Sequence, residues 1–297
     1  MVERHGYPVG INGQRCRLDA KGFAVIGYGK LGGIELGYGS DLDLVFIHAL
    51  EEQSETDGKK SISGAEFAIR VAQKFMSLMT TQTLDGRVYE IDTRLRPSGE
   101  AGMLVTSLKA YEHYQQKSAW LWEHQALVRA RSIAGDADLC QQFEQIRRQI
   151  LTQVRDENEV RQEVLKMRQK MKDHLGSSTE QKKHGIFHLK QDAGGIVDIE
   201  FMAQYAVLAW GGTNPDLAHY SDNVRILEDA ARAGCLSSED ATALIHAYLR
   251  ERAESHRLAL ANQSMQVNAA DWHDTREIVC KLWQRLIDPT AIALESE

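Results

Sequence analysis

Two aspartates, Asp41 and Asp43, flank Leu42 at the start of an apolar stretch that runs to His48 and predicts a strand. Alternate residues of a strand face the same side of a sheet, so these two carboxylates should lie next to each other. A bound cation would relieve their mutual repulsion, and hard oxygen ligands of this kind suit magnesium. Taken alone, the pair is also consistent with two solvated aspartates at an exposed strand end.

A second alternating stretch, Arg87 to Arg96, predicts another strand and supplies a third carboxylate, Asp92. Alternation places Glu90, Asp92, Arg94 and Arg96 on one face of this strand. Three carboxylates on neighbouring strands can hold two metal ions, one to activate an attacking hydroxyl and one to neutralise a leaving pyrophosphate. Arginine forks bind phosphate oxygens bidentately, which suits such a reaction. A sheet face whose charges simply pair with each other is the alternative.

The glycines from Gly27 to Gly32 spell G-x-G-x-x-G directly after a predicted strand, Phe23–Tyr28. This spacing is typical of dinucleotide-binding folds, but those require a crossover helix before the next strand and an acidic residue about twenty positions on. Here the next strand begins too soon to leave room for a crossover helix. Its aspartates, Asp41 and Asp43, lie at the start of that strand and not at its end. Lys30 is followed by leucine, so the motif is not a phosphate-binding loop of the G-K-[ST] type either. We therefore predict a turn, with at most a short helix, between two short strands.

The remaining pattern changes from mixed to helical along the chain. One helix is expected around Phe67–Met79, and nearly everything after Ser107 has helical periodicity. The expected helices cover 107–116, 118–131, 138–151, 157–175, a segment beginning at 195 or 196, the stretch between Asp222 and Gly234, a helix after Ser237, and 271–287. The change predicts a sheet-containing domain over residues 1–135 and a helical domain over residues 136–297.

Composition excludes several classes of protein. A net charge of −7 and a pI near 5.9 argue against a broad nucleic-acid surface. No apolar run reaches the length of a membrane span, and the first residues do not read as an export signal. The four cysteines are scattered, which favours a reduced cytoplasmic protein without a disulfide framework or a zinc site: Cys16, Cys140, Cys235 and Cys280.

The helical half contributes one further candidate for anion binding. Lys190 and the glycines Gly194 and Gly195 precede a predicted helix, so Lys190 could reach a phosphate group. Asp198 and Glu200 are two residues apart and do not share a helix face, which favours a helix-terminus or interface role over catalysis. Structural roles are also expected for Trp120, Trp122, His124 and Arg129.

At these motifs the sequence resembles the glutamine synthetase adenylyltransferase family, which belongs to the DNA-polymerase-beta-like nucleotidyltransferases. The resemblance covers nearly the whole chain. It is carried by Gly27–Leu36, Ser40–Phe46, Tyr89–Gly99, Trp120–Arg131, Gly194–Phe201 and Ser221–Glu228.

The resemblance implies an α+β fold, with a small mixed-sheet nucleotidyltransferase core followed by an all-α helical bundle. Enzymes of this family have two homologous halves, one removing AMP from glutamine synthetase and one adding it. The segments Gly27–Gly29, Leu36–Tyr38 and Trp122–Gln125 resemble the adenylylating half more closely. The deadenylylating half is the second possibility.

The resemblance also implies roles for individual residues. Asp41 and Asp43 are expected to bind two magnesium ions, and Asp92 to complete the ion that activates a tyrosine hydroxyl for attack on ATP. Further contacts to the nucleotide are expected from Gly29, Lys30, Ser40, Arg94, Arg96 and Lys190. The implied partners are glutamine synthetase as substrate, with the PII protein and glutamine as regulators of the full-length bacterial enzyme.

Two other functional classes remain open from the sequence. Another nucleotidyltransferase, such as a PII uridylyltransferase or an RNA-tailing enzyme, would use the same three carboxylates. The acidic balance disfavours RNA, and the Gly27–Gly33 motif disfavours the uridylyltransferases. A regulatory domain that binds nucleotide or PII without chemistry is the third possibility, and the complete carboxylate set argues against it.

Overall fold

The computed structural model describes residues 1–10, 13, 15, 22–84, 86 and 89–289, which form two compact units, Met1–Ile150 and Leu151–Glu297. The helix α6 (Ala137–Leu151) lies almost wholly in the first unit, whereas the sequence pattern suggested a boundary after residue 135. Cys16, Arg87 and Val88 lie outside the described residues.

A mixed sheet forms the centre of the first unit. Strands β2 (Phe23–Gly27) and β3 (Leu42–His48) pair antiparallel, and β7 (Arg131–Gly135) pairs antiparallel with the other edge of β2. Two short strands, β5 (Ile91–Asp92) and β6 (Val105–Ser107), both run parallel to β3. The antiparallel β2–β3 pair confirms that the glycine-rich motif does not open a Rossmann crossover, which would require parallel strands.

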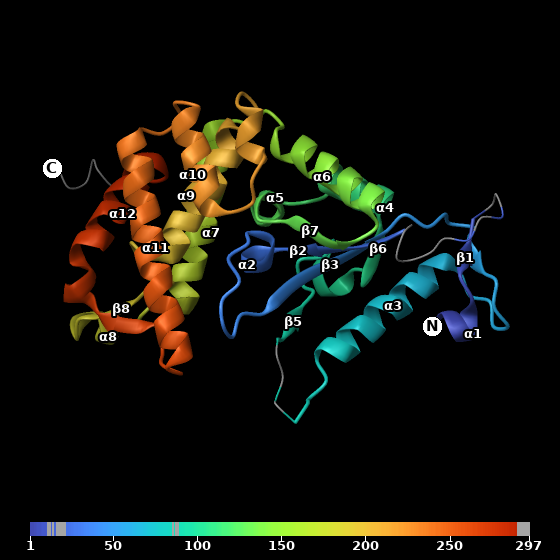
Figure 1. Cartoon of the computed structure of the whole chain (residues 1–297). Helices are drawn as coiled ribbons and strands as arrows, with labels where there is room; N and C mark the ends of the chain where they lie inside the picture. The colour runs from blue at the N-terminus through green and yellow to red at the C-terminus, as the bar shows by residue number, and fades with distance from the viewer. Residues whose placement is uncertain (11–12, 14, 16–21, 85, 87–88, 290–297) are drawn as a thin grey trace. The chain divides into compact units, whose positions relative to one another are not determined.

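Helices cover both faces of this sheet (Figure 1). The helix α3 (Gly64–Met79) packs on one face, where Leu42, Leu44 and Phe46 alternate inward from β3. On the opposite face lie α4 (Leu108–Lys117) and α6. The core against α3 consists of Phe23, Val25, Leu42, Leu44, Phe46, Leu50, Ala68, Ala72 and Val105.

Some expected elements of the first unit differ from the structure. Within the described part of the expected strand, residues 89–96, strand pairing is limited to β5, where Ile91 and Asp92 pair with β3. The expected helix 118–131 ends early as α5 (Leu121–Val128), and Arg131 begins β7. The sequence of β7 has no apolar alternation, so its strand conformation follows from backbone pairing with β2.

The chain before β2 contains short elements that the sequence did not indicate. The helix α1 (Val2–His5) is followed by β1 (Pro8–Val9), which pairs antiparallel with β4 (Glu55–Thr56). These pieces are too short for a periodic pattern.

The second unit is built around one buried helix. The helix α9 (Ile196–Trp210) is apolar on nearly all sides and contacts α7 (Glu157–Leu175), α10 (Asn223–Arg232), α11 (Ser238–Leu260) and α12 (His273–Leu286). The helices α10 and α11 begin after N-cap residues, since the side chains of Asp222 and Ser237 accept backbone N–H bonds at their starts.

This unit is not entirely helical. After the short α8 (Thr179–Lys183), strands β8 (Ile186–His188) and β9 (Gln266–Asn268) pair antiparallel. Short 3-10 turns cover Pro215–Ala218 and Ala269–Trp272. Across the residues that the structure describes, no helix is both long and apolar enough to cross a membrane.

Candidate functional site

The strands β3 and β5 bring two of the three candidate carboxylates together. Asp43 and Asp92 are direct partners in the parallel register, and Leu42 pairs with Ile91. Adjacent strands lie about 4.8 Å apart, and side chains at paired positions share a face. The sequence therefore correctly predicted that Asp92 lies on a strand beside Asp43. Asp41 stands one residue before β3 and is exposed to solvent.

The glycine-rich turn lies against Asp43. Gly29 begins the four-residue helix α2 (Gly29–Gly32) with a positive φ of 55°. A Cβ atom on Gly29 would lie 2.4 Å from Oδ2 of Asp43, so a side chain at this positive φ would be strained and would displace the carboxylate. The backbone N–H of Tyr28 donates to the carbonyl of Asp43 at 2.9 Å. The glycine-rich turn and Asp43 are thus packed directly against each other and joined by a backbone hydrogen bond.

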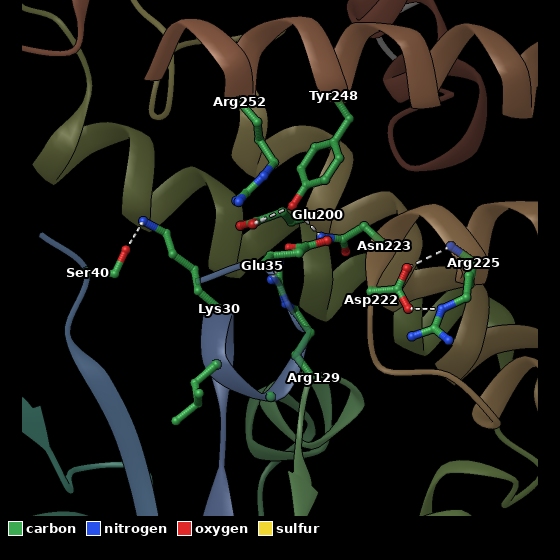
Figure 2. Close-up of polar contacts among 12 residues, drawn as sticks. Lys30, Glu35, Ser40, Arg129, Glu200, Asp222, Asn223, Arg225, Tyr248 and Arg252 are labelled. Carbon is green, nitrogen blue, oxygen red and sulfur yellow. Dashed lines mark hydrogen bonds and ion pairs between the residues drawn. The ribbon is translucent and has the colours of Figure 1, made fainter. Parts of the chain in front are cut away.

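Lys30 and Ser40 also meet at this turn. The Lys30 ammonium group donates a hydrogen bond to the Ser40 hydroxyl at 3.3 Å (Figure 2). Ser40 is buried directly before Asp41. The contact brings together two residues that the sequence predicted to bind phosphate groups.

Arg94 pairs with Asp92 rather than extending the strand. Its side-chain Nε lies 2.8 Å from Oδ2, and its backbone N–H donates to Oδ1 at 2.8 Å. The side-chain hydrogen bond from Arg94 is the largest cause that lowers the pKa of Asp92, so this carboxyl is ionised at neutral pH. The Arg94 side chain is itself 71% exposed and can leave this contact without unpacking a core.

Arg96 has a different environment from the one expected. Its guanidinium donates to the backbone carbonyls of Thr93 (2.8 Å), Glu100 (3.1 Å) and Gly102 (3.3 Å). The expected shared strand face of Glu90, Asp92, Arg94 and Arg96 does not form, because the strand ends at Asp92 and both arginines lie in the turns that follow. In this conformation Arg96 mainly orders the loop.

A depression of about 620 Å³ opens beside these residues. Its lining carries carboxylates and guanidinium groups, which makes it a polar site suited to a charged ligand. The lining residues are Asp41, Glu90, Ile91, Asp92, Thr93, Arg94, Arg96 and Glu100. Sequence reasoning did not single out Glu90 or Glu100 as site residues, although the alternating stretch contained the signal for Glu90.

The donor set fits a hard divalent cation. Asp41, Asp43 and Asp92 offer only oxygen ligands, and two of them are register partners. Among the described residues, no three His, Cys, Asp or Glu side chains converge closely enough to hold a metal ion. The carboxylate of Asp92 accepts a hydrogen bond from Arg94. A cation bound by Asp92 would therefore compete with this guanidinium.

Lys190 belongs to the second unit, where its side chain is exposed. Near it, Asp198 lies in the first turn of α9 and accepts the Gly194 N–H at 2.7 Å. Asp198 also pairs with the buried Arg168 at 2.5 Å. The expectation of a helix-terminus role for Asp198 agrees with these contacts.

Two family models match consecutive parts of the chain. The glutamate-ammonia ligase adenylyltransferase model matches residues 1–146, and the GlnD PII-uridylyltransferase model matches residues 146–268. The boundary between the two matches lies close to the division between the two structural units.

Three relatives carry the same name, bifunctional glutamine synthetase adenylyltransferase/adenylyl-removing enzyme. The Acinetobacter baylyi protein is 84% identical over 100% of this chain and 32% of its own length. The Pseudomonas aeruginosa protein is 49% identical over 96% of this chain and 30% of its own length. The Mannheimia haemolytica protein is 50% identical over 96% of this chain and 29% of its own length.

The mixed-sheet core and these matches place the chain in the nucleotidyltransferase class. Over its whole length the chain is similar to members of the glutamine synthetase adenylyltransferase family, as the sequence resemblance predicted. The chain spans about a third of the length of the curated relatives that it matches.

Proposed function

We propose that this chain transfers AMP from ATP to a tyrosine hydroxyl of glutamine synthetase and releases pyrophosphate. The observation that carries the proposal is the parallel register of Asp43 with Asp92, beside a polar depression that Asp41 also lines. The family name supplies the substrate class, and the relatives' names include glutamine synthetase. The two acidic strands supply a location for the chemistry.

In the proposed reaction, the tyrosine hydroxyl loses its proton to solvent and its oxygen forms a bond to the α-phosphorus of ATP. The bond from that phosphorus to the bridging β-oxygen breaks, and pyrophosphate leaves with the bonding electrons. Asp41, Asp43 and Asp92 would hold magnesium, which when bound lowers the pKa of the attacking hydroxyl and neutralises the leaving group.

The chain's other site residues would orient the nucleotide. Lys30 and Ser40 already contact each other at the glycine turn, where they would bind phosphate oxygens. Gly29 would let the backbone approach, since a side chain there would strike Asp43. Arg94 can turn from Asp92 toward a phosphate because it is exposed. Arg96 would shape the loop that borders the depression. Lys190 is proposed as a further phosphate contact on the basis of the family resemblance.

A labelling experiment tests the proposal. The chain is incubated with magnesium, unmodified glutamine synthetase and ATP labelled at either the α- or the γ-phosphorus. We expect label on glutamine synthetase only from α-labelled ATP. Loss of outer-shell partners of a metal commonly costs about 10- to 100-fold in activity, so Asp43→Asn, which changes a direct ligand, should cost at least about 100-fold. No transfer by the parent chain would overturn the proposal.

The same assay separates two competing functions. The relatives' names include an adenylyl-removing activity, so the second candidate is phosphate-dependent release of AMP as ADP from modified glutamine synthetase. The match of residues 146–268 to a PII-uridylyltransferase model adds uridylyl transfer as a third. Release of ADP from modified enzyme, or transfer from labelled UTP to PII, would replace adenylylation as the conclusion.

We further propose that the full-length protein acts in the bacterial cytoplasm, where ATP and glutamine synthetase are available. Glutamine and the PII protein are proposed as its regulators on the basis of the family resemblance.

A further inference from the structure

We propose that Arg129 and Glu35 are positioning residues that hold the segment from Gly29 to Asp41 in place beside Asp43. Neither residue is among those that line the acidic depression, and their role is to hold the segment that carries the site residues. The inference rests on the proposed function, because this segment carries Lys30, Ser40 and Asp41. Its structural part is tested independently of that function.

The backbone of Arg129 fixes the end of α2. Arg129 directly follows α5, and its carbonyl oxygen would lie 2.0 Å from a Cβ atom on Gly32. The carbonyl of Gly27 would lie 2.4 Å from the same atom. Gly32 is thus enclosed between two backbone segments, and any side chain there would push α2 away from β2.

The side chain of Arg129 then crosses the turn that follows α2 (Figure 2). A Cβ atom on Gly33 would lie 2.8 Å from its Nη2 atom, and the guanidinium continues to an ion pair with Glu35. The side chains of Arg129 and Glu35 are only 4% and 10% exposed. Breaking one partner of a buried ion pair is costly because it leaves the other charge uncompensated.

Other contacts complete the attachment of α2 at both ends. Arg131 donates to the carbonyls of Leu31 (3.3 Å) and Gly32 (3.2 Å), and the N–H of Glu35 donates to the Lys30 carbonyl at 2.7 Å. At the other end, Gly29 lies against Asp43. A four-residue helix has no stability of its own, so these contacts determine where Lys30 stands.

Hydrogen exchange tests the structural part. In Glu35→Gln, we expect the amides from Gly29 to Asp41 to exchange about tenfold faster or more, while the amides of β2 and β3 keep their protection. The matched control is Glu123→Gln, another buried carboxylate of the same unit, which caps α5 through the Trp120 N–H. The control should lower stability without exposing residues 29–41.

Kinetics test the functional part. In a parent chain that transfers AMP, Glu35→Gln should raise the KM for ATP about tenfold or more and leave the KM for the protein substrate unchanged, whereas Glu123→Gln should change neither. Glu35→Asp, which keeps the charge, should restore part of the ATP affinity. A merely structural role would lower the amount of folded protein without this split between the two KM values.

The outcomes separate this inference from the proposed function. Failure of the parent chain to transfer AMP overturns the proposed function alone, because hydrogen exchange still decides whether Arg129 and Glu35 hold the segment. Unchanged exchange from 29 to 41 in Glu35→Gln overturns the inference, as does an unchanged KM for ATP in an active enzyme. If Glu35→Gln does not fold, Arg129→Lys, which retains a cation, is judged by the same two measurements.

Discussion

At the scale of single residues, two different cations can pair with the carboxylate of Asp92 and compete for it. The Arg94 guanidinium holds it in the present structure, and a divalent ion would use the same oxygens. Arg94 is therefore a counter-ion whose position decides whether Asp92 is available. The arrangement gives opposite expectations for metal binding and nucleotide binding.

The variant Arg94→Gln should bind Mn²⁺ more tightly than the parent when no nucleotide is present. Removing a unit positive charge about 6 Å from a divalent ion, screened as in water, favours binding by about 1.4 kcal/mol, or roughly tenfold. Affinity for ATP should fall, because a phosphate partner is lost. Electron paramagnetic resonance of free Mn²⁺ measures the first effect, and fluorescence titration with a labelled nucleotide measures the second.

The control for this experiment removes a different positive charge from the same unit. Lys74→Gln, on the exposed side of α3, should change neither affinity. Weaker Mn²⁺ binding by Arg94→Gln would contradict the competition between Arg94 and the metal.

Single-residue predictions succeeded where they depended on local spacing. The position of Asp92 on a strand beside Asp43 followed from apolar alternation in two short segments. The positions of Arg94 and Arg96 did not, because the alternation continues past the point where β5 loses its partner on β3. The length of a strand depends on its neighbour, and the local sequence does not contain that information.

At the scale of elements, the helix α11 carries a buried carboxyl group, that of Glu251. The sequence of the helix does not distinguish Glu251 from the charged residues on its surface. Glu251 is fully buried, and neither of its carboxylate oxygens has a hydrogen-bond partner among the described residues. Burial, followed by the negative charge of Asp198, raises the pKa of Glu251 to about 9, while Arg250 and Arg276 oppose the shift. The group is thus protonated in the folded protein at neutral pH.

This shift makes stability depend on pH with a definite sign. Between the ordinary pKa of 4.5 and about 9, the folded state holds a proton that the unfolded state has lost. Stability from this group is therefore fully present below pH 4.5 and declines as pH rises, by at most about 1.4 kcal/mol per pH unit. Above about pH 9 the decline from this group ends.

Glu251→Gln removes the titrating group and should stabilise the second unit at pH 8. Its melting temperature should also vary less between pH 6 and pH 9 than that of the parent. Calorimetry across this range measures both effects. The control, Glu254→Gln, changes a carboxylate on the same helix that pairs with Arg257, and it should leave the slope unchanged. A parent-like slope in Glu251→Gln would show that Glu251 is not the titrating group.

Element boundaries were predicted best where a capping residue or a long apolar face marks them. The helix α7 begins and ends where its periodicity does, and α11 begins after the Ser237 cap. The short strands β6 and β7 were missed because each is defined by its partner. The same holds for β8 and β9, which pair with each other although they lie far apart in the sequence of the second unit.

At the scale of the whole molecule, the two units have separate cores. The first is centred on the sheet and α3, and the second on α9. The change in sequence pattern after residue 135 indicated that a second unit exists, but α6 is helical and still belongs to the sheet-containing unit. Composition along the chain records the type of element and not the core that the element joins.

Matched core substitutions should reveal these separate cores. Val45→Ala in β3 and Val164→Ala in α7 each remove two methyl groups from buried positions, which costs about 2 kcal/mol. We expect Val45→Ala to accelerate hydrogen exchange mainly in the described residues up to Ile150, and Val164→Ala mainly from Leu151 onward. Equal acceleration across both units by either variant would show that the chain unfolds as one cooperative body.

The strands β5 and β6 pair along the same edge of β3, β5 at Leu42 and Asp43 and β6 from Phe46 to His48. The chain between them leaves the sheet with Arg94 and Arg96 and returns to it at Val105. An insertion or deletion there would leave both pairings in register. During evolution this excursion could therefore change in length and charge, and so in the ligand that it accepts, while the acidic strands that it borders stay as they are.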